Sequence, residues 1–300
     1  MSTAKSPTAF NPSATAPAPR PLDDASATAR SFPRAFFWGT ALLAIALVPT
    51  FFAQVFWARA LVTPWYVPIG GSIAALVLSL IAWRHRRWWR VGVALFTVAL
   101  ACFEWFFVVA GTRLPDYQGP IAAGGALPAF HAVLADKPQG DGSASSATTG
   151  SAGASSDAGA SGTAIDESYF RQGRDTVLVF FQGRWCPFCM TQLTELESHH
   201  DEFARAGAEV VVVSIEDPQM AAETQRDFPH LKVVSDEHRE LADAVDVINK
   251  GFSPDGGDSA APTILLLDGT GTVRWLHRPQ RFIARPSSAE LLARLAELRG

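Results

Sequence analysis

The chain of 300 residues is long enough for about two domains, and its composition changes sharply near residue 113. A formal net charge of −4 at pH 7 gives no reason to expect a nucleic-acid partner. The three cysteines, Cys102, Cys186 and Cys189, are too few for a secreted fold held together by disulfides.

Residues 1–34 are rich in Ala, Pro, Ser and Thr and have no sustained apolar periodicity. Such a segment buries too little apolar surface to offset the entropy lost on ordering, so we expect a disordered tail. It also lacks the apolar core and cleavage site of a secretory signal.

Residues 35–112 are predicted to form a membrane domain of three transmembrane α-helices. The runs 35–58 and 60–83 contain no charged residue, and the run 91–112 contains only Glu104. About 20 apolar residues suffice to cross the hydrocarbon core, so all three runs qualify. The alternative, three buried helices of a soluble protein, fits such long uncharged runs poorly.

The distribution of basic residues predicts the orientation of these spans. The loop between the second and third runs is rich in arginine, whereas the loop before it holds only Arg59. The positive-inside rule then places the tail (residues 1–34) and the arginine-rich loop in the cytoplasm, and everything after Thr112 outside. The basic residues that carry this argument are Lys5, Arg20, Arg30, Arg34, Arg84, Arg86, Arg87 and Arg90.

Two residues of the third run, Cys102 and Glu104, have chemistry unusual for a membrane helix. An ionisable residue within a membrane is a functional candidate by default. The alternative is that Glu104 lies near the outer interface or is hydrogen-bonded within the bundle. Cys102 has no partner thiol nearby, so we expect it to be a small packing residue.

The extracytoplasmic domain is expected to begin in residues 113–142 and to be interrupted by a linker. Residues 143–164 contain only Ser, Ala, Gly, Thr and one Asp, which predicts a flexible coil. The segment "GALPAFHAVLAD" (125–136) precedes the linker and is typical of an edge strand or turn.

Residues 165–300 alternate between buried strands and helices, which indicates an α/β fold with a mixed sheet flanked by helices. The predicted strands are 176–182, 208–215 and 231–236, followed by a hairpin of 263–268 with 272–277. The predicted helices are 186–206, 218–228 with Asp217 as cap, 237–247, and 287–298 capped by Ser287 or Ser288.

The stretch "GRWCPFCMTQL" (183–193) holds the candidate redox centre. Cys186 lies where a strand meets a helix, and the free N–H groups and dipole of a helix start favour a thiolate there. Pro187 suits the first helical position. Cys189 follows one turn later, about 5 Å away between Cα atoms, which a disulfide accepts. We therefore expect Cys186 to attack a partner and Cys189 to resolve the mixed disulfide.

A metal site is the weaker interpretation of the same pair. His199 and His200 lie about 15 Å farther along the helix, too far to share a tetrahedral site. Binding of copper with a distant residue such as His277 stays open, but we expect no metal and no cofactor.

Residues from about 124 to 300 resemble the thioredoxin-like superfamily, and within it the peroxiredoxin-related AhpC/TSA (redoxin) branch. The resemblance implies a thioredoxin-like sheet and thiol redox chemistry. It is carried by the segments "ALPAF", "VFFQGRWCPFCMTQL", "VVSDEHRELADAVDV" and "APTILLLDGTGTVRW".

The resemblance leaves the reaction open between two branches. Peroxiredoxins carry P-x-x-x-[T/S]-x-x-C, which aligns the peroxidatic cysteine with Cys189 and the hydroxyl residue with Cys186. The proline of that motif aligns with Gln182 and the family's arginine with the region of Ala261, so all three groups that assist peroxide reduction are replaced.

Thioredoxin-like oxidoreductases instead have a proline, usually cis, directly before a threonine that faces the CxxC, and Pro262–Thr263 matches that pattern. We interpret the chain as a peroxiredoxin-like body with a thioredoxin-like centre. Arg184 either lowers the cysteine pKa values or is an exposed charge. Trp185 either packs or forms a platform for a partner.

The leading hypothesis is a membrane-anchored thiol–disulfide oxidoreductase that exchanges disulfides with extracytoplasmic protein or small thiol partners. One alternative is a thiol peroxidase that uses Cys189, with Cys186 as resolving thiol. Another is a membrane-tethered redox sensor or assembly factor. Because Cys102 cannot form a disulfide alone within the membrane, an external electron donor of unknown identity is implied.

Overall fold

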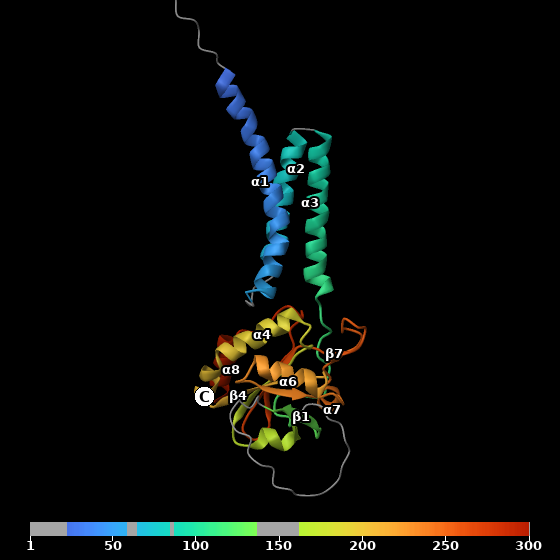
Figure 1. Cartoon of the computed structure of the whole chain (residues 1–300), viewed down its shortest axis with the longest axis vertical. Helices are drawn as coiled ribbons and strands as arrows, with labels where there is room; N and C mark the ends of the chain where they lie inside the picture. The colour runs from blue at the N-terminus through green and yellow to red at the C-terminus, as the bar shows by residue number, and fades with distance from the viewer. Residues whose placement is uncertain (1–22, 59–64, 85–86, 137–161, 300) are drawn as a thin grey trace, which may run out of the picture.

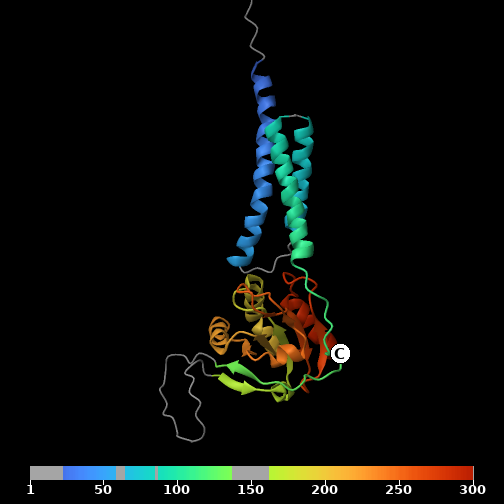
Figure 2. The ribbon, with the colours of Figure 1, turned by 90° about the vertical axis from the view of Figure 1, so that its right-hand side faces the viewer.

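The computed structural model describes residues 23–58, 65–84, 87–136 and 162–299. Three long helices stand on one side of an α/β domain, and Figures 1 and 2 show their ends meeting that domain. The expectations for residues 1–22, for Arg59 and Arg86, and for the linker up to residue 161 lie outside the described residues.

The helices of the bundle are α1 (Asp23–Phe56), α2 (Tyr66–Arg84) and α3 (Trp88–Phe106), which a π-helical turn extends to Gly111. Each contains a stretch long and apolar enough to cross a membrane. Helix α1 begins at Asp23, so the expectation of disorder is wrong for residues 23–34. Helix α2 begins at Tyr66, later than the apolar run suggested.

Small residues form the contact between α2 and α3, where Ala74, Ala82, Ala94 and Ala101 are buried. Such residues let helices approach closely in a membrane. Cys102 is exposed on the bundle surface, so the expectation that it packs inside is wrong.

A seven-stranded mixed sheet in the order β2-β1-β5-β4-β3-β8-β9 forms the second domain. Its strands are β1 (Ala132–Ala135), β2 (Gly162–Ile165), β3 (Asp175–Phe180), β4 (Ala208–Ser214), β5 (Lys232–Ser235), β8 (Thr263–Leu267) and β9 (Val273–His277). A short pair, β6 (Ile248–Asn249) and β7 (Ser259–Ala260), lies apart. The helices are α4 (Pro187–Ser198), α5 (His200–Arg205), α6 (Pro218–Asp227), α7 (Glu240–Ala244) and α8 (Ser288–Arg299).

This arrangement confirms the predicted mixed sheet flanked by helices, with three further helices before it. Three details differ from the expectations. Residues 162–164 belong to β2, which pairs with β1, and are not coil. The helix predicted over 186–206 breaks at His199, and α7 is shorter than predicted.

The central strand β3 is buried on both faces, as its continuous apolar run predicted. Val177 and Val179 pack on the side of α4, α6 and α8, whereas Leu178 and Phe180 face the opposite core. Two of the predicted helix caps are present. Asp217 accepts the N–H of Met220, and the Ser287 hydroxyl accepts the N–H of Glu290.

Candidate redox site

The candidate site begins where β3 ends and α4 starts. Gly183 has a φ of 142°, and a Cβ there would lie 2.6 Å from Oε1 of Glu216, so only glycine fits this turn. Cys186 is the N-cap of α4 and Pro187 its first residue, as predicted. The turn places both cysteines at the end of the helix that faces the bundle.

Both thiols converge on one acceptor. Cys186 Sγ lies 3.1 Å from Gln182 Oε1, and Cys189 Sγ lies 3.7 Å from the same oxygen. The two cysteines are free and only 1% and 0% exposed. Two thiols that share one oxygen are placed to form a disulfide. Gln182, which stands at the position of the peroxiredoxin proline, therefore touches the reacting groups.

Arg285 supplies the positive charge of the site. Its Nη2 lies 3.6 Å from Cys189 Sγ, and its Nη1 donates to the carbonyls of Phe282 and Ala284. These bonds hold the guanidinium in the loop before α8. Arg285 was not predicted from the sequence, because no motif marks it and it lies far along the chain from Cys189.

The two thiols differ in acidity. Burial raises the pKa of Cys189, but the hydrogen bond from Cys186 and the charge of Arg285 outweigh it and lower that pKa to about 6. The hydrogen bond to Cys189, together with burial, raises the pKa of Cys186 well above its ordinary value. The charge of Arg285 thus favours a thiolate at Cys189 over one at Cys186, and which of the two thiols attacks a partner stays a prediction.

Arg184 pairs with acidic side chains of α6 and not with the thiols. Its guanidinium pairs with Asp227 at 2.9 Å and with Glu223 at 3.5 Å, and its backbone N–H donates to Glu216. Arg184 thus fastens the turn to α6. Trp185, beside it, is 38% exposed, which leaves both a packing role and a platform role as predictions.

Thr263 begins β8 in register with Phe180, the last residue of β3, which leads into the cysteine turn. The Ala261–Pro262 peptide is trans, so the cis proline expected by analogy is wrong. The Thr263 hydroxyl donates to the carbonyl of Ala261 at 3.0 Å and accepts from Arg278.

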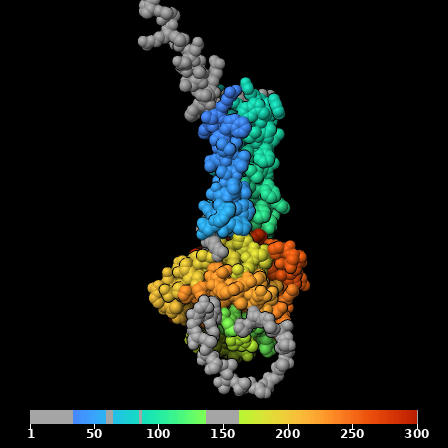
Figure 3. Space-filling model, in the orientation of Figure 1, coloured from blue at the N-terminus to red at the C-terminus, as the bar shows by residue number. Residues whose placement is uncertain are grey.

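The helix bundle covers the site on one side. The ring of Phe188, between the two cysteines, packs against Phe51 of α1 and against Phe282, with centroids 6.2 and 5.9 Å apart. The Thr191 hydroxyl lies 3.2 Å from the carbonyl of Val55. Figure 3 shows the bundle seated on the domain over this region.

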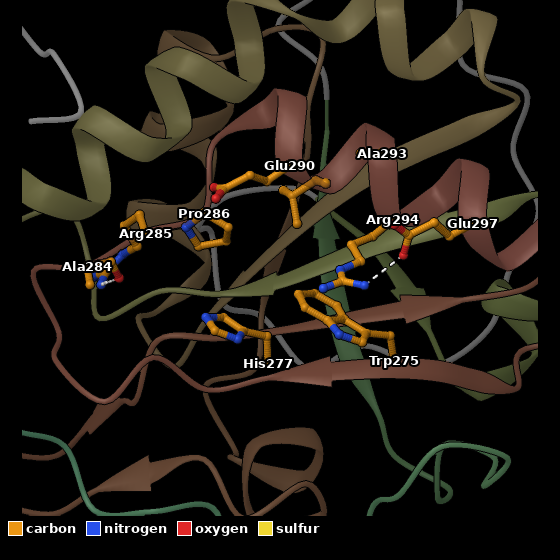
Figure 4. Close-up of a pocket in the computed structure, with 10 residues that line it drawn as sticks. Trp275, His277, Ala284, Arg285, Pro286, Glu290, Ala293, Arg294 and Glu297 are labelled. Atoms are coloured by element: carbon orange, nitrogen blue, oxygen red, sulfur yellow. Dashed lines mark hydrogen bonds and ion pairs between the residues drawn. The ribbon is translucent and has the colours of Figure 1, made fainter. Parts of the chain in front are cut away.

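A groove of about 490 Å³ opens on another side, between β9 and α8 (Figure 4). Arg285 lies at one end of the groove, and the stacked rings of Trp275 and His277 line the strand side. Burial lowers the pKa of His277. Among the residues that the structure describes, no cluster of three or more Cys, His, Asp or Glu side chains is placed to hold a metal.

Comparison with known proteins gives one family. Residues 153–276 match the model of the AhpC/TSA family. No curated protein matches the chain.

Several solved structures are similar to the chain. Reduced 2-Cys peroxiredoxin from Plasmodium vivax is 14% identical, over 60% of this chain and 83% of that one, with a TM-score of 0.46. AhpC from Mycobacterium tuberculosis is 22% identical, over 60% and 94%, also with a TM-score of 0.46. A putative thioredoxin reductase from Burkholderia cenocepacia is 19% identical, over 58% and 96%, with a TM-score of 0.46.

Proposed function

We propose that the chain is a membrane-anchored thiol–disulfide oxidoreductase centred on Cys186 and Cys189, because residues 153–276 match the model of the AhpC/TSA family. The family match supports thiol redox chemistry in general, either oxidoreductase or peroxidase. The observation that carries the narrower proposal is the convergence of both thiols on Gln182 Oε1, which favours a reversible disulfide between them.

The reaction proceeds by two exchanges. The Cys189 thiolate, stabilised by Arg285, attacks one sulfur of a partner disulfide and releases the other as a thiolate. Cys186 then gives its proton to that thiolate and attacks Cys189 Sγ. The second partner sulfur leaves as a thiolate that takes a proton from water, so the partner becomes a dithiol and the chain holds the Cys186–Cys189 disulfide. The reverse sequence oxidises a partner. The groove beside Arg285 offers a place for the partner segment.

The three apolar helices support anchoring in a lipid bilayer. The arginine-rich loop between α2 and α3 favours a cytoplasmic N-terminus, which puts the redox domain on the extracytoplasmic side. An external thiol donor or acceptor completes each cycle, and no nucleic acid takes part.

Peroxide reduction is the second candidate, and Arg285 favours it. An arginine beside a thiolate with a pKa of about 6 is suited to attack on a peroxide. Cys189 would become a sulfenic acid, which Cys186 would convert to the disulfide with loss of water. Against this candidate stand the replaced proline and hydroxyl positions at Gln182 and Cys186.

Single cysteine variants of the full chain separate the two candidates. Cys186→Ser removes the resolving thiol, so we expect it to trap a partner on Cys189 as a mixed disulfide, whereas Cys189→Ser traps less. Cys102→Ser is the matched control and should trap nothing. Fast sulfenylation of Cys189 by hydrogen peroxide in Cys186→Ser, without any trapped partner, would replace the oxidoreductase proposal with the peroxidase.

A further inference from the structure

The loop before α8 connects the helix bundle to the thiol pair. It pairs with the chain that leaves α3, since the N–H of Phe282 donates to the carbonyl of Thr112 at 2.9 Å. Arg281 forms an antiparallel bridge with Arg113 at the same place. Ile283, only 6% exposed, lines an apolar cavity of about 220 Å³ in the bundle. Three consecutive residues therefore fasten this loop to the bundle.

The side chain of Arg281 adds two polar contacts to this attachment. Its Nε donates to the carbonyl of Val108 at 2.9 Å, and its guanidinium lies over the ring of Trp65, 5.0 Å from the centroid. Val108 belongs to the π-helical turn that ends α3, and the last carbonyls of a helix lack backbone donors and carry the negative end of its dipole. The face of an aromatic ring also attracts a cation. One side chain thus binds both the end of α3 and the residue before α2.

The same loop carries Arg285. Nη1 of Arg285 donates to the carbonyl of Phe282, and Nη2 lies 3.6 Å from Cys189 Sγ. Phe282 is thus bonded through its N–H to the bundle and through its carbonyl to the guanidinium that faces the thiol. The N–H of Ala284 donates to the carbonyl of Arg281 at 3.0 Å, which closes the loop in a turn. A displacement of this turn from the bundle would move Arg285 relative to Cys189.

We propose that Arg281 is a positioning residue, which holds Arg285 against Cys189 by fastening this loop to the end of the helix bundle. The inference rests on the proposed function and adds a role for the bundle in that reaction. A Coulomb interaction falls inversely with distance, so a guanidinium that moved from 3.6 Å to about 7 Å would lose about half of its effect on the thiolate. The bundle thereby controls how much of Cys189 is ionised.

The test measures the pH midpoint of Cys189 alkylation by iodoacetamide in the full chain, held in phosphatidylcholine nanodiscs. Arg281→Leu removes both side-chain contacts with the bundle, whereas Arg281→Lys keeps a positive charge. The matched control is Arg113→Leu, because Arg113 is the bridge partner of Arg281, is exposed and carries the same charge. Arg281→Leu is also combined with Arg285→Ala, which separates an effect through Arg285 from a direct effect of the lost charge.

We expect Arg281→Leu to raise the midpoint by about half as much as Arg285→Ala does, and Arg281→Lys to raise it less. The control should keep the native midpoint. In the Arg285→Ala background, Arg281→Leu should cause no further shift, because Arg281 acts through Arg285. A midpoint in Arg281→Leu equal to that of the control, or the same shift with and without Arg285, would refute the positioning role.

A second variant keeps the test decisive if Arg281→Leu does not fold. Trp65→Leu removes the ring under Arg281 and leaves the redox domain unchanged, so it should also raise the midpoint, and an unchanged midpoint would contradict the proposal. The proposed function is tested separately by equilibrating the native chain with glutathione buffers. A pair that forms no disulfide there would refute that function, whereas the midpoints decide the role of Arg281 in either case.

Discussion

Replacement of Arg285 by alanine tests whether this residue sets the acidity of Cys189. At 3.6 Å, a full positive charge in surroundings of effective dielectric constant ~20 stabilises a thiolate by about 4.6 kcal/mol, or about 3.4 pKa units. The guanidinium is only half-buried and its charge is delocalised, so water reduces this to about 1–2 units. The pKa of Cys189, about 6 in the native chain, should therefore rise to between about 7 and 8 in Arg285→Ala.

The reaction rate at pH 7 is a poor measure of this change. For a shift of two units, the thiolate fraction falls from about 90% to about 10%, a loss of nearly tenfold. The intrinsic nucleophilicity of the thiolate rises with its pKa, with a Brønsted coefficient of about 0.4–0.5, which returns most of that loss. We expect a rate at pH 7 within about twofold of the native chain and a faster rate at pH 9.

The assay that resolves the shift is the pH dependence of Cys189 alkylation by iodoacetamide, read on the cysteine peptide by mass spectrometry. The midpoint should move upward in Arg285→Ala and much less in Arg285→Lys, which keeps the charge. Arg294→Ala is the control, because Arg294 lines the same groove but pairs with Glu297. A midpoint in Arg285→Ala equal to that of the control would refute the assignment of Arg285.

Three further predictions concern other parts of the chain. Gln182→Leu removes the acceptor of the thiols and should make the reduction potential more negative by about 10–30 mV in glutathione buffers, so an unchanged potential would contradict the role of Gln182. Burial raises the pKa of Asp236 to about 6, so the folded state holds a proton that the unfolded state releases, and the free energy of unfolding falls as the pH rises from about 4 to 6. Asp236→Asn should remove about 1–3 kcal/mol of this pH dependence, measured by thermal unfolding at each pH. An unchanged pH dependence in the variant would show that other groups cause it. Gly71→Ala should destabilise the bundle by about 1–3 kcal/mol, because the added methyl group collides with the carboxyl group of Glu104. The double variant with Glu104→Ala should recover most of this loss in thermal unfolding, and additive effects of the two substitutions would contradict the contact.

The sequence predicted those features that depend on local pattern. The uncharged runs identify the three helices, and the apolar run that contains β3 identifies a strand buried on both faces. The position of Cys186 at the start of α4 follows from the strand, the turn and Pro187. In each case the residues that determine the feature are neighbours in the chain.

The features that the sequence did not predict depend on contacts between distant segments. Arg285 reaches Cys189 from a loop that precedes the last helix, and Arg184, next to the cysteines in sequence, turns away toward Asp227. Neighbouring positions in the sequence therefore did not reveal which arginine contacts the thiols. The sequence also led us to expect the lower pKa at Cys186, because a helix start favours a thiolate there. The charge of Arg285 instead lowers the pKa of Cys189.

The same contacts bear on why three helices precede the redox domain, when one would anchor it. A single span could not form the apolar cavity of about 220 Å³ that Val48, Val67 and Leu100 line from three different helices, nor bury the carboxyl group of Glu104 against Gly71. The Phe51–Phe188 contact then joins this cavity to the start of α4. The bundle covers Phe188 and Thr191 of α4 on one side of the site, and the groove beside Arg285 opens on the other, so a water-soluble partner has to approach from the groove.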